Sequence, residues 1–186
     1  TYMYCYSEDT GGALAITQKN HLKGLDYIDV SVFVENCLFS NNTSVKQGGS
    51  AYIYNINKVI FHECQFLNNQ AVWAGGVSII NLTNLMVNES KFIGNSASHK
   101  GGAMLLHNVI IVRIKNNLHF INNQAHNGGV IHVEDNQLIM ITNALFTNNI
   151  AKKYAGTLYS IHSEKVIILN SHFNRNTAYA RSAAIY

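Results

Sequence analysis

A motif that returns at a nearly constant interval constrains this chain more than any other feature. A Phe is followed three residues later by Asn, and eight or nine residues later by a pair of small residues, usually Gly-Gly. Successive copies are 26 to 28 residues apart, with the Phe at Phe39, Phe66, Phe92, Phe120, Phe146 and Phe173. A fixed period of this size is typical of a solenoid, in which each repeat buries its apolar face against its neighbours.

Within each repeat, apolar and often β-branched residues alternate at period two, which predicts strands and not helices. One run precedes the Phe, as in Val59-x-Phe61, and another consists of the Phe and the residue two before it. A third run follows the small pair. In the repeat that contains Gly75-Gly76, we assign this run to Ser78 and Ile80. Three runs per repeat predict an all-β parallel β-helix (a solenoid) with three strands per coil and six to seven coils of about 27 residues. A leucine-rich repeat fits less well, because the chain has no Pro and no helical half-repeat.

The recurring residues have structural roles in such a fold. Phe rings one coil apart can stack in the interior. We expect the Asn residues to turn a corner in the left-handed conformation and to form a ladder of amide hydrogen bonds, with each Asn worth about 1–3 kcal/mol. This structural ladder comprises Asn42, Asn69, Asn95, Asn123, Asn149 and Asn176. The Gly pairs mark a second corner, where a positive φ or a close backbone approach excludes a Cβ atom.

The period extends through the 186 residues without a linker-like segment, so we interpret 1–186 as a single domain. Residues 17–29 lengthen the first repeat and are predicted to form a loop insertion. Both ends of the sequence fall inside a coil, which predicts a fragment of a longer solenoid that continues at both ends. Cys37 and Cys64 share one register; we expect free thiols, because stacked Cβ vectors suit a disulfide poorly, and a bridge is the alternative.

Charge and motif content argue against several kinds of partner. Only 12% of the residues are charged, the formal net charge is +3, and Lys and Arg form no run. Nucleic-acid binding is therefore not expected, and no apolar stretch is long enough for a transmembrane helix. No cofactor or metal is predicted either. The cysteines lack a C-x-x-C spacing, and His99 and His126, expected in adjacent coils, have no third ligand.

The candidate ligand-binding residues are mainly aromatic. In the strand after the small pair, outward positions hold Tyr52, Tyr54, His107, His132, Tyr159 and Tyr186, and a turn column two residues before the pair holds Lys46, Trp73, His99, His126 and Lys153. Tyr and Trp combine an apolar face with a polar edge, which suits sugar and protein surfaces. We predict a ligand-binding face of Tyr52, Tyr54, Trp73, His132 and Tyr159, although Tyr is common on half-exposed strands in general.

Acidic residues are too sparse to predict a catalytic site. Enzymes that cleave glycosidic bonds use paired carboxylates, whereas Glu134-Asp135 is the only adjacent acidic pair in the regular coils. No carboxylate shares its register one coil away. Asn-x-Ser/Thr sequons identify Asn81 and Asn88 as candidate glycosylation sites.

The Phe-x-x-Asn motif with Gly-Gly-Ala/Val resembles the repeats of polymorphic outer-membrane proteins and related right-handed β-helix families, whose wider relatives include pectate-lyase-like enzymes. The resemblance covers nearly the whole chain and departs from the motif at Ala155 and Ser182, where Gly is usual. It implies a right-handed coil and an extracellular or cell-surface protein, often an adhesin, but transfers no functional residue. We therefore expect a non-catalytic, adhesin-like scaffold that binds glycan or protein through its outer face. The alternative is a segment of a polysaccharide-active enzyme whose catalytic residues lie outside this region.

Overall fold

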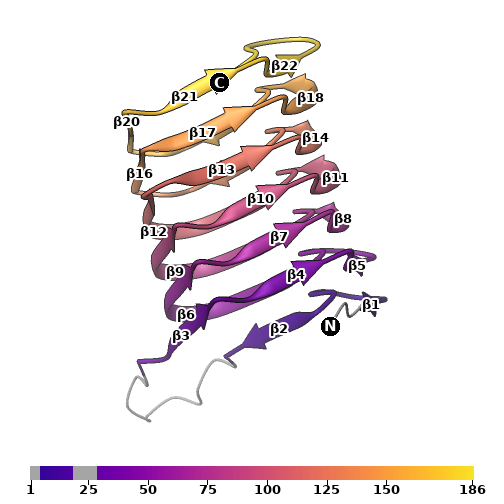
Figure 1. Ribbon diagram of the computed structural model, residues 1–186. Coiled ribbons are helices and arrows are strands. Elements are labelled where there is room, and N and C mark those ends of the chain that lie inside the picture. The colour runs from indigo at the N-terminus through magenta and orange to yellow at the C-terminus, as the bar shows by residue number, and fades with distance from the viewer. Residues whose placement is uncertain (1–4, 19–28) are drawn as a thin grey trace.

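The computed structural model describes residues 5–18 and 29–186, so most of the loop insertion predicted at 17–29 lies outside the described residues. The chain winds into a parallel β-solenoid of about five turns, with about 27 residues per turn and three parallel sheets (Figure 1). The period, the fold class and the three strands per coil are as the repeat predicts, whereas the number of turns is about five and not the predicted six to seven.

Each sheet collects the equivalent strands of successive coils, and we name the sheets by their position in the repeat. The Phe sheet contains β4 (Leu38–Ser40), β7 (Gln65–Leu67), β10 (Lys91–Ile93), β13 (Leu118–Ile121), β17 (Ala144–Thr147) and β21 (His172–Asn174). The corner sheet contains β1 (Tyr6–Ser7), β5 (Thr43–Ser44), β8 (Gln70–Trp73), β11 (Ser96–Lys100), β14 (Gln124–Asn127), β18 (Ile150–Tyr154) and β22 (Thr177–Ala178). The long sheet contains β2 (Leu14–Thr17), β3 (Ser31–Glu35), β6 (Ala51–His62), β9 (Val77–Asn88), β12 (Met104–Lys115), β15 (Ile131–Glu134), β16 (Leu138–Thr142), β19 (Leu158–Ile161) and β20 (Lys165–Leu169).

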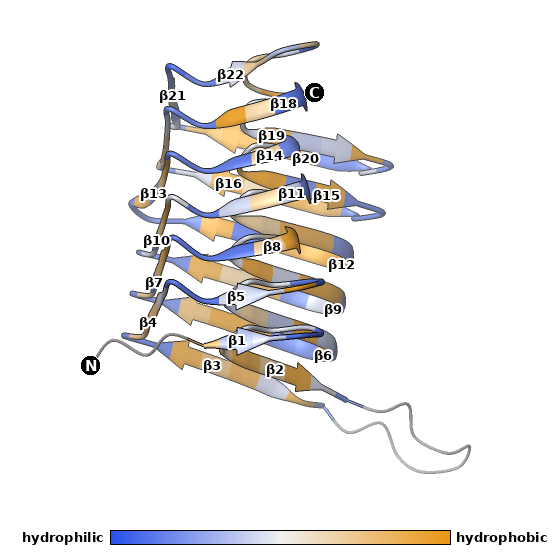
Figure 2. Cartoon of the chain, turned by 90° about the vertical axis from the view of Figure 1, so that its right-hand side faces the viewer, coloured by the Kyte–Doolittle hydropathy of each residue, from blue (hydrophilic) through white to orange (hydrophobic). Residues whose placement is uncertain are grey.

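The assignment of segments to sheets differs from the sequence interpretation. The two apolar runs that flank positions such as Asn81 belong to one sheet, because β6, β9 and β12 continue through both runs. These strands bend at Asn55, Asn81 and Asn108, which have φ of 60°, 56° and 53°. The third sheet is the corner sheet, whose short strands are mostly polar and lie where only turns were expected. Figure 2 shows hydrophilic residues at the corners and hydrophobic residues recurring along the strands of each coil.

The Phe column forms the predicted interior stack. Neighbouring rings have centroid distances of 4.5 to 5.2 Å and lie within 20° of parallel. The four central rings, those of Phe66, Phe92, Phe120 and Phe146, are fully buried. Offset stacking adds to the hydrophobic contribution of burying these large side chains.

The Asn ladder is also present, but its backbone conformation corrects the prediction. Asn69 donates from its backbone N and its Nδ2 to Oδ1 of Asn95, at 3.1 and 3.0 Å, and the same pair of bonds recurs along the column. No ladder Asn has a positive φ; the preceding residue does, as at Asn68 with φ of 53°. The ladder amide is thus selected for its hydrogen bonds, and its neighbour makes the left-handed turn.

The small-residue pair has the two predicted roles, one at each position. The first residue has a positive φ, as at Gly101 with φ of 63°, and the second is too close to the next coil for a side chain. A Cβ at Gly102 would lie 2.1 Å from the carbonyl oxygen of Gly129. In the third coil the pair is Ala74-Gly75 and not Gly75-Gly76, since Ala74 has φ of 57° and Gly49 donates to its carbonyl.

This one-residue shift reverses two predicted side-chain directions. Val77 and Ile79 pair with Ala51 and Ile53 and fill the core, so Ser78 and Ile80 point outward. The prediction that Ser78 and Ile80 face the interior was therefore wrong. The cysteines are free thiols as expected, with Cys64 buried and Cys37 partly exposed.

Candidate functional site

The candidate site lies on the outer surface of the first half of the long sheet. We call this surface the outer stripe, and it consists of two outward columns and the adjacent edge of the corner sheet. The first outward column is Tyr52, Ser78, Leu105, His132 and Tyr159, and the second is Tyr54, Ile80, His107, Glu134 and Ile161. The corner-sheet column is Gln47, Trp73, Lys100, Asn127, Tyr154 and Arg181. The predicted turn column is therefore correct only at Trp73. In the other coils the residue in this column is the one that follows the predicted residue, as with Lys100 in place of His99.

Aromatic rings accumulate at the C-terminal end of the outer stripe. His132 stacks on Tyr159 with ring centroids 4.9 Å apart, and Tyr159 stacks on Tyr186 at 5.3 Å. Tyr154 joins from the corner sheet, 5.9 Å from Tyr159. Two cations cover these rings: Lys153 Nζ lies 4.7 Å from the Tyr154 centroid, and the Arg181 guanidinium carbon lies 5.9 Å from it. At the other end, Tyr52 and Tyr54 stack at 6.5 Å.

Between these aromatic ends lies an open hollow of about 270 Å³, which we call the central hollow. Its apolar lining is Trp73, Ile80 and Leu105, and its polar lining is Gln47, Lys100, His107 and Glu134. The residues come from four successive coils and from two sheets, so only the stacking of coils brings them together. A mainly apolar cavity with a few convergent polar groups is the usual form of a small-ligand site.

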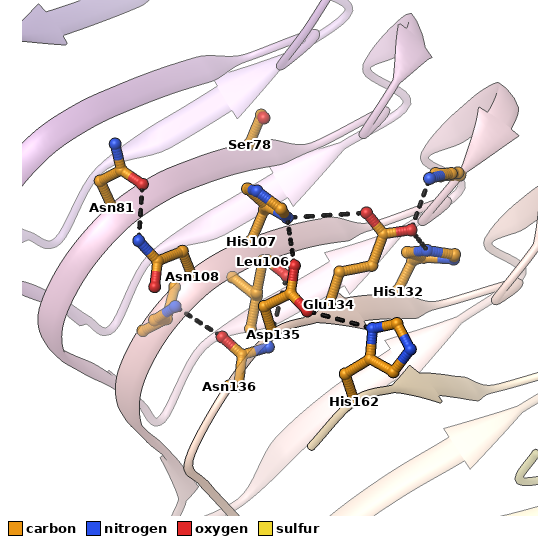
Figure 3. Close-up of polar contacts among 12 residues, drawn as sticks. Ser78, Asn81, Leu106, His107, Asn108, His132, Glu134, Asp135, Asn136 and His162 are labelled. Carbon is orange, nitrogen blue, oxygen red and sulfur yellow. Dashed lines mark hydrogen bonds and ion pairs between the residues drawn. The ribbon is translucent and has the colours of Figure 1, made fainter.

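Glu134 is the centre of the polar network beside the central hollow. Its Oε1 accepts hydrogen bonds from Lys100 Nζ at 2.5 Å and from His132 Nε2 at 2.8 Å. Its Oε2 lies 3.6 Å from His107 Nδ1, which is also 3.7 Å from Asp135 Oδ2. The network ends at His162, whose Nδ1 lies 3.1 Å from Asp135 Oδ1 (Figure 3).

Burial and hydrogen bonding set the charges of this network. Burial alone would raise the pKa of Glu134, but the hydrogen bonds from Lys100 and His132 outweigh it, and the pKa lies below its usual value. Burial lowers the pKa of His132 despite the opposing effect of Glu134. At neutral pH, therefore, Glu134 is ionised and His132 is a neutral hydrogen-bond donor.

The placement of His132 corrects its predicted role as a ligand-binding residue. Its side chain points outward from the sheet as expected, but it is 0% exposed. Tyr159 covers one face of the ring, and Nδ1 is buried without a hydrogen-bond partner. His132 can therefore orient Glu134 but is not available to a ligand in this conformation. Of the other predicted binding residues, Trp73 lines the central hollow, and Tyr52, Tyr54 and Tyr159 lie on the outer stripe.

Sequence reasoning missed five residues that line the hollow. Gln47, Lys100 and Leu105 did not belong to any predicted site. Ile80 was assigned to the core, and Glu134 was considered only as half of an acidic pair. The signal that could have found them is register. Once Ala74-Gly75 is aligned with Gly101-Gly102, Trp73 is placed beside Lys100, and Leu105 beside Ser78.

Neither a metal site nor a second carboxylate pair completes the network. Within residues 5–18 and 29–186, no group of three or more His, Cys, Asp or Glu could hold a metal ion. His99 contacts the Trp73 ring, with centroids 6.0 Å apart. The arrangement therefore offers binding groups: an aromatic surface, a hydrogen-bonded carboxylate and a paired ammonium.

The two candidate glycosylation sites have different surroundings. Asn81 lies at the outer bend of β9 and accepts a hydrogen bond from Asn108, and its sequon residue Thr83 is exposed. The Asn88 sequon instead ends at Ser90, which is 0% exposed and donates a hydrogen bond to the Asn88 carbonyl. Glycosylation stays a prediction, and the structure favours Asn81 as the acceptor.

Comparison of the chain with protein-family models, curated protein sequences and solved structures returns no match. The described part of the chain contains no helix that could span a lipid bilayer. The geometry of the outer stripe is therefore the basis for a proposed function.

Proposed function

We propose that this protein is a non-catalytic, adhesin-like scaffold that binds glycans along the outer stripe, with the central hollow as the principal contact. The observation that carries the proposal is the shared lining of this hollow by Trp73 and the Lys100–Glu134 pair. Trp gives a flat apolar surface for the C–H face of a sugar ring. Lys, Gln and the carboxylate give donors and acceptors for its hydroxyl groups.

The remainder of the outer stripe supports an extended ligand. Tyr52 and Tyr54 lie on the N-terminal side of the hollow, and Tyr154 and Tyr159 lie on the C-terminal side, so aromatic surface is available over several coils. Successive coils are about 4.8 Å apart. A polymer that follows the solenoid axis would contact the same kind of side chain repeatedly, and such multivalent contact raises affinity without new chemistry.

The finer assignments belong to the same proposal. We propose a right-handed coil like that of the polymorphic outer-membrane-protein repeats, because parallel strand crossovers are nearly always right-handed. We also propose an extracellular or cell-surface location, which the resemblance of the Phe, Asn and Gly motif to these repeats supports.

The experiment is a glycan-array screen of the wild-type protein, followed by calorimetric titration of each positive glycan. Trp73→Ala should reduce affinity at least tenfold, which is the effect expected of an aromatic anchor at the centre of an interface. The matched control is Phe33→Ala, which removes an aromatic side chain that is 66% exposed on the second half of the long sheet.

Two results would contradict the proposal. One is an array without signal, or a glycan affinity that Trp73→Ala and Phe33→Ala change equally. The other is depolymerisation of the bound glycan, measured as new reducing ends. The second result would favour the polysaccharide-active alternative.

A further inference from the structure

We infer that the central hollow selects uncharged sugar residues over acidic ones, such as uronates, of the same linkage. This inference depends on the proposed glycan binding and specifies its substrate class. It follows from how the charges in and around the hollow are paired.

The cation that lines the central hollow is already paired. This cation is Lys100, and its Nζ is 2.5 Å from Glu134 Oε1. The side chains of the pair are 35% and 21% exposed, so water screens this contact only partly. An acidic sugar would have to compete with Glu134 for the ammonium group.

Glu134 Oε2 is the carboxylate oxygen that can accept a hydrogen bond from a ligand. Both hydrogen bonds to Glu134 are made to Oε1, whereas Oε2 has His107 Nδ1 at 3.6 Å, beyond hydrogen-bond distance. An ionised carboxylate oxygen accepts hydrogen bonds from sugar hydroxyls but repels another carboxylate. The remaining lining residues, Gln47, Trp73, Ile80 and Leu105, carry no charge that would offset this repulsion.

His132 maintains the charge of Glu134. It is buried against Tyr159 and donates to Oε1, so the carboxylate keeps two donors without any contribution from the ligand. Asp135 adds a second negative charge beside His107. The network beside the hollow therefore contains two carboxylates, one ammonium, and the histidines His107, His132 and His162.

The other cations near the outer stripe do not line the hollow. Lys153 Nζ lies over the Tyr154 ring, and the Arg181 guanidinium lies near the Tyr154 and Tyr186 rings. Both cations therefore face the C-terminal aromatic rings, which leaves Lys100 as the cation that lines the hollow.

The test compares matched oligosaccharides by calorimetric titration. The probes are cello-oligosaccharides and their C6-oxidised uronate forms, and galacto-oligosaccharides with the corresponding galacturonates, all of equal length. The wild-type protein should bind the neutral form at least about tenfold more tightly than the acidic form, because an unfavourable like charge is a standard means of discrimination. Glu134→Gln should reduce this ratio to below about threefold by improving acidic binding, since Lys100 loses its partner.

Lys100→Gln is the matched opposite variant. It leaves the Glu134 carboxylate without its ammonium partner, so the preference for the neutral form should increase. Thermal melts of both variants, compared with wild type, establish that the fold is retained. Because the two variants are predicted to move the ratio in opposite directions, a general weakening of the site cannot produce the expected pattern.

The outcomes separate the two proposals. Equal or tighter binding of the acidic form by wild type, or a ratio that Glu134→Gln leaves unchanged, would overturn the selectivity while leaving glycan binding intact. If neither form of either sugar binds, and no array glycan responds to Trp73→Ala, glycan binding itself fails and the selectivity fails with it.

Discussion

The Asn ladder gives the sharpest stability prediction, because the substitution Asn123→Ala removes a known set of hydrogen bonds. Asn123 is 0% exposed. Its Oδ1 accepts from the backbone N and Nδ2 of Asn95 at 3.0 and 3.1 Å, and its Nδ2 donates to the Phe92 carbonyl at 2.9 Å and to Asn149 Oδ1 at 3.1 Å. All four bonds disappear in the Ala variant.

The free-energy cost follows from the groups that stay buried. The Asn95 backbone N–H is left without its acceptor, which costs about 1–3 kcal/mol, and the other lost bonds add about 1–2 kcal/mol. The total loss in unfolding free energy is therefore about 2–5 kcal/mol. In a protein of this size, each kcal/mol lowers Tm by about 2–4 °C, so Tm should fall by about 4–20 °C.

The matched control is Asn174→Ala, an exposed Asn on β21 of the Phe sheet. Substitutions at such sites usually change stability by about 0.5 kcal/mol or less. Thermal unfolding followed by circular dichroism gives both values under one buffer condition. If the Tm of Asn123→Ala agrees with that of Asn174→Ala within a degree or two, the reasoning that the ladder stabilises the solenoid is refuted.

Two further predictions concern the backbone and pH. Gly102→Ala should prevent folding or lower Tm strongly, because its Cβ would lie 2.1 Å from the Gly129 oxygen; Ala155→Gly, at φ of 53°, should change Tm little, and equal effects would contradict the close approach. His132 and Glu134 both have folded-state pKa values below their ordinary values of 6.5 and 4.5, so the unfolded chain binds more protons in acid. The stability that they contribute is complete above those ordinary values and is lost as pH falls through the lower folded-state values. Tm should therefore begin to fall below about pH 6.5, and His132→Gln should reduce the loss between pH 6.5 and 5; an unchanged pH profile would contradict the assigned burial of His132.

The features that could be predicted from the sequence are those that repeat. Phe66 and Phe92 stack because a coil has a fixed length, and the same geometry places each ladder Asn above the last. Even Cys5 occupies a ladder position, since its backbone N donates to Asn42 Oδ1. These contacts recur in successive coils, so the pattern is visible without knowledge of any single contact.

The features that could not be predicted depend on differences between coils. A Gly-Gly dipeptide at 75–76 concealed the true pair at Ala74-Gly75, because Ala also adopts the left-handed conformation there. The shift moved Ile80 from the predicted core to the lining of the central hollow. Burial of His132 depends on Tyr159 one coil later, and the short polar strands of the corner sheet lack an apolar alternation. In each case a contact between neighbouring coils, and not the local sequence pattern, determines the structure.

The most direct test of the account is a distance between equivalent positions in distant coils. Ser40 and Asn174 lie in one outward column of the Phe sheet, connected through Leu67, Ile93, Ile121 and Thr147. Nitroxide labels at these two positions, in a variant with Cys5, Cys37 and Cys64 replaced by Ser, are separated by 134 residues but by only five coils. Pulsed electron paramagnetic resonance should give a narrow distribution near 24 Å, at about 4.8 Å per coil. A broad distribution, or one centred above about 40 Å, would contradict the stacked register on which the outer stripe and the central hollow depend.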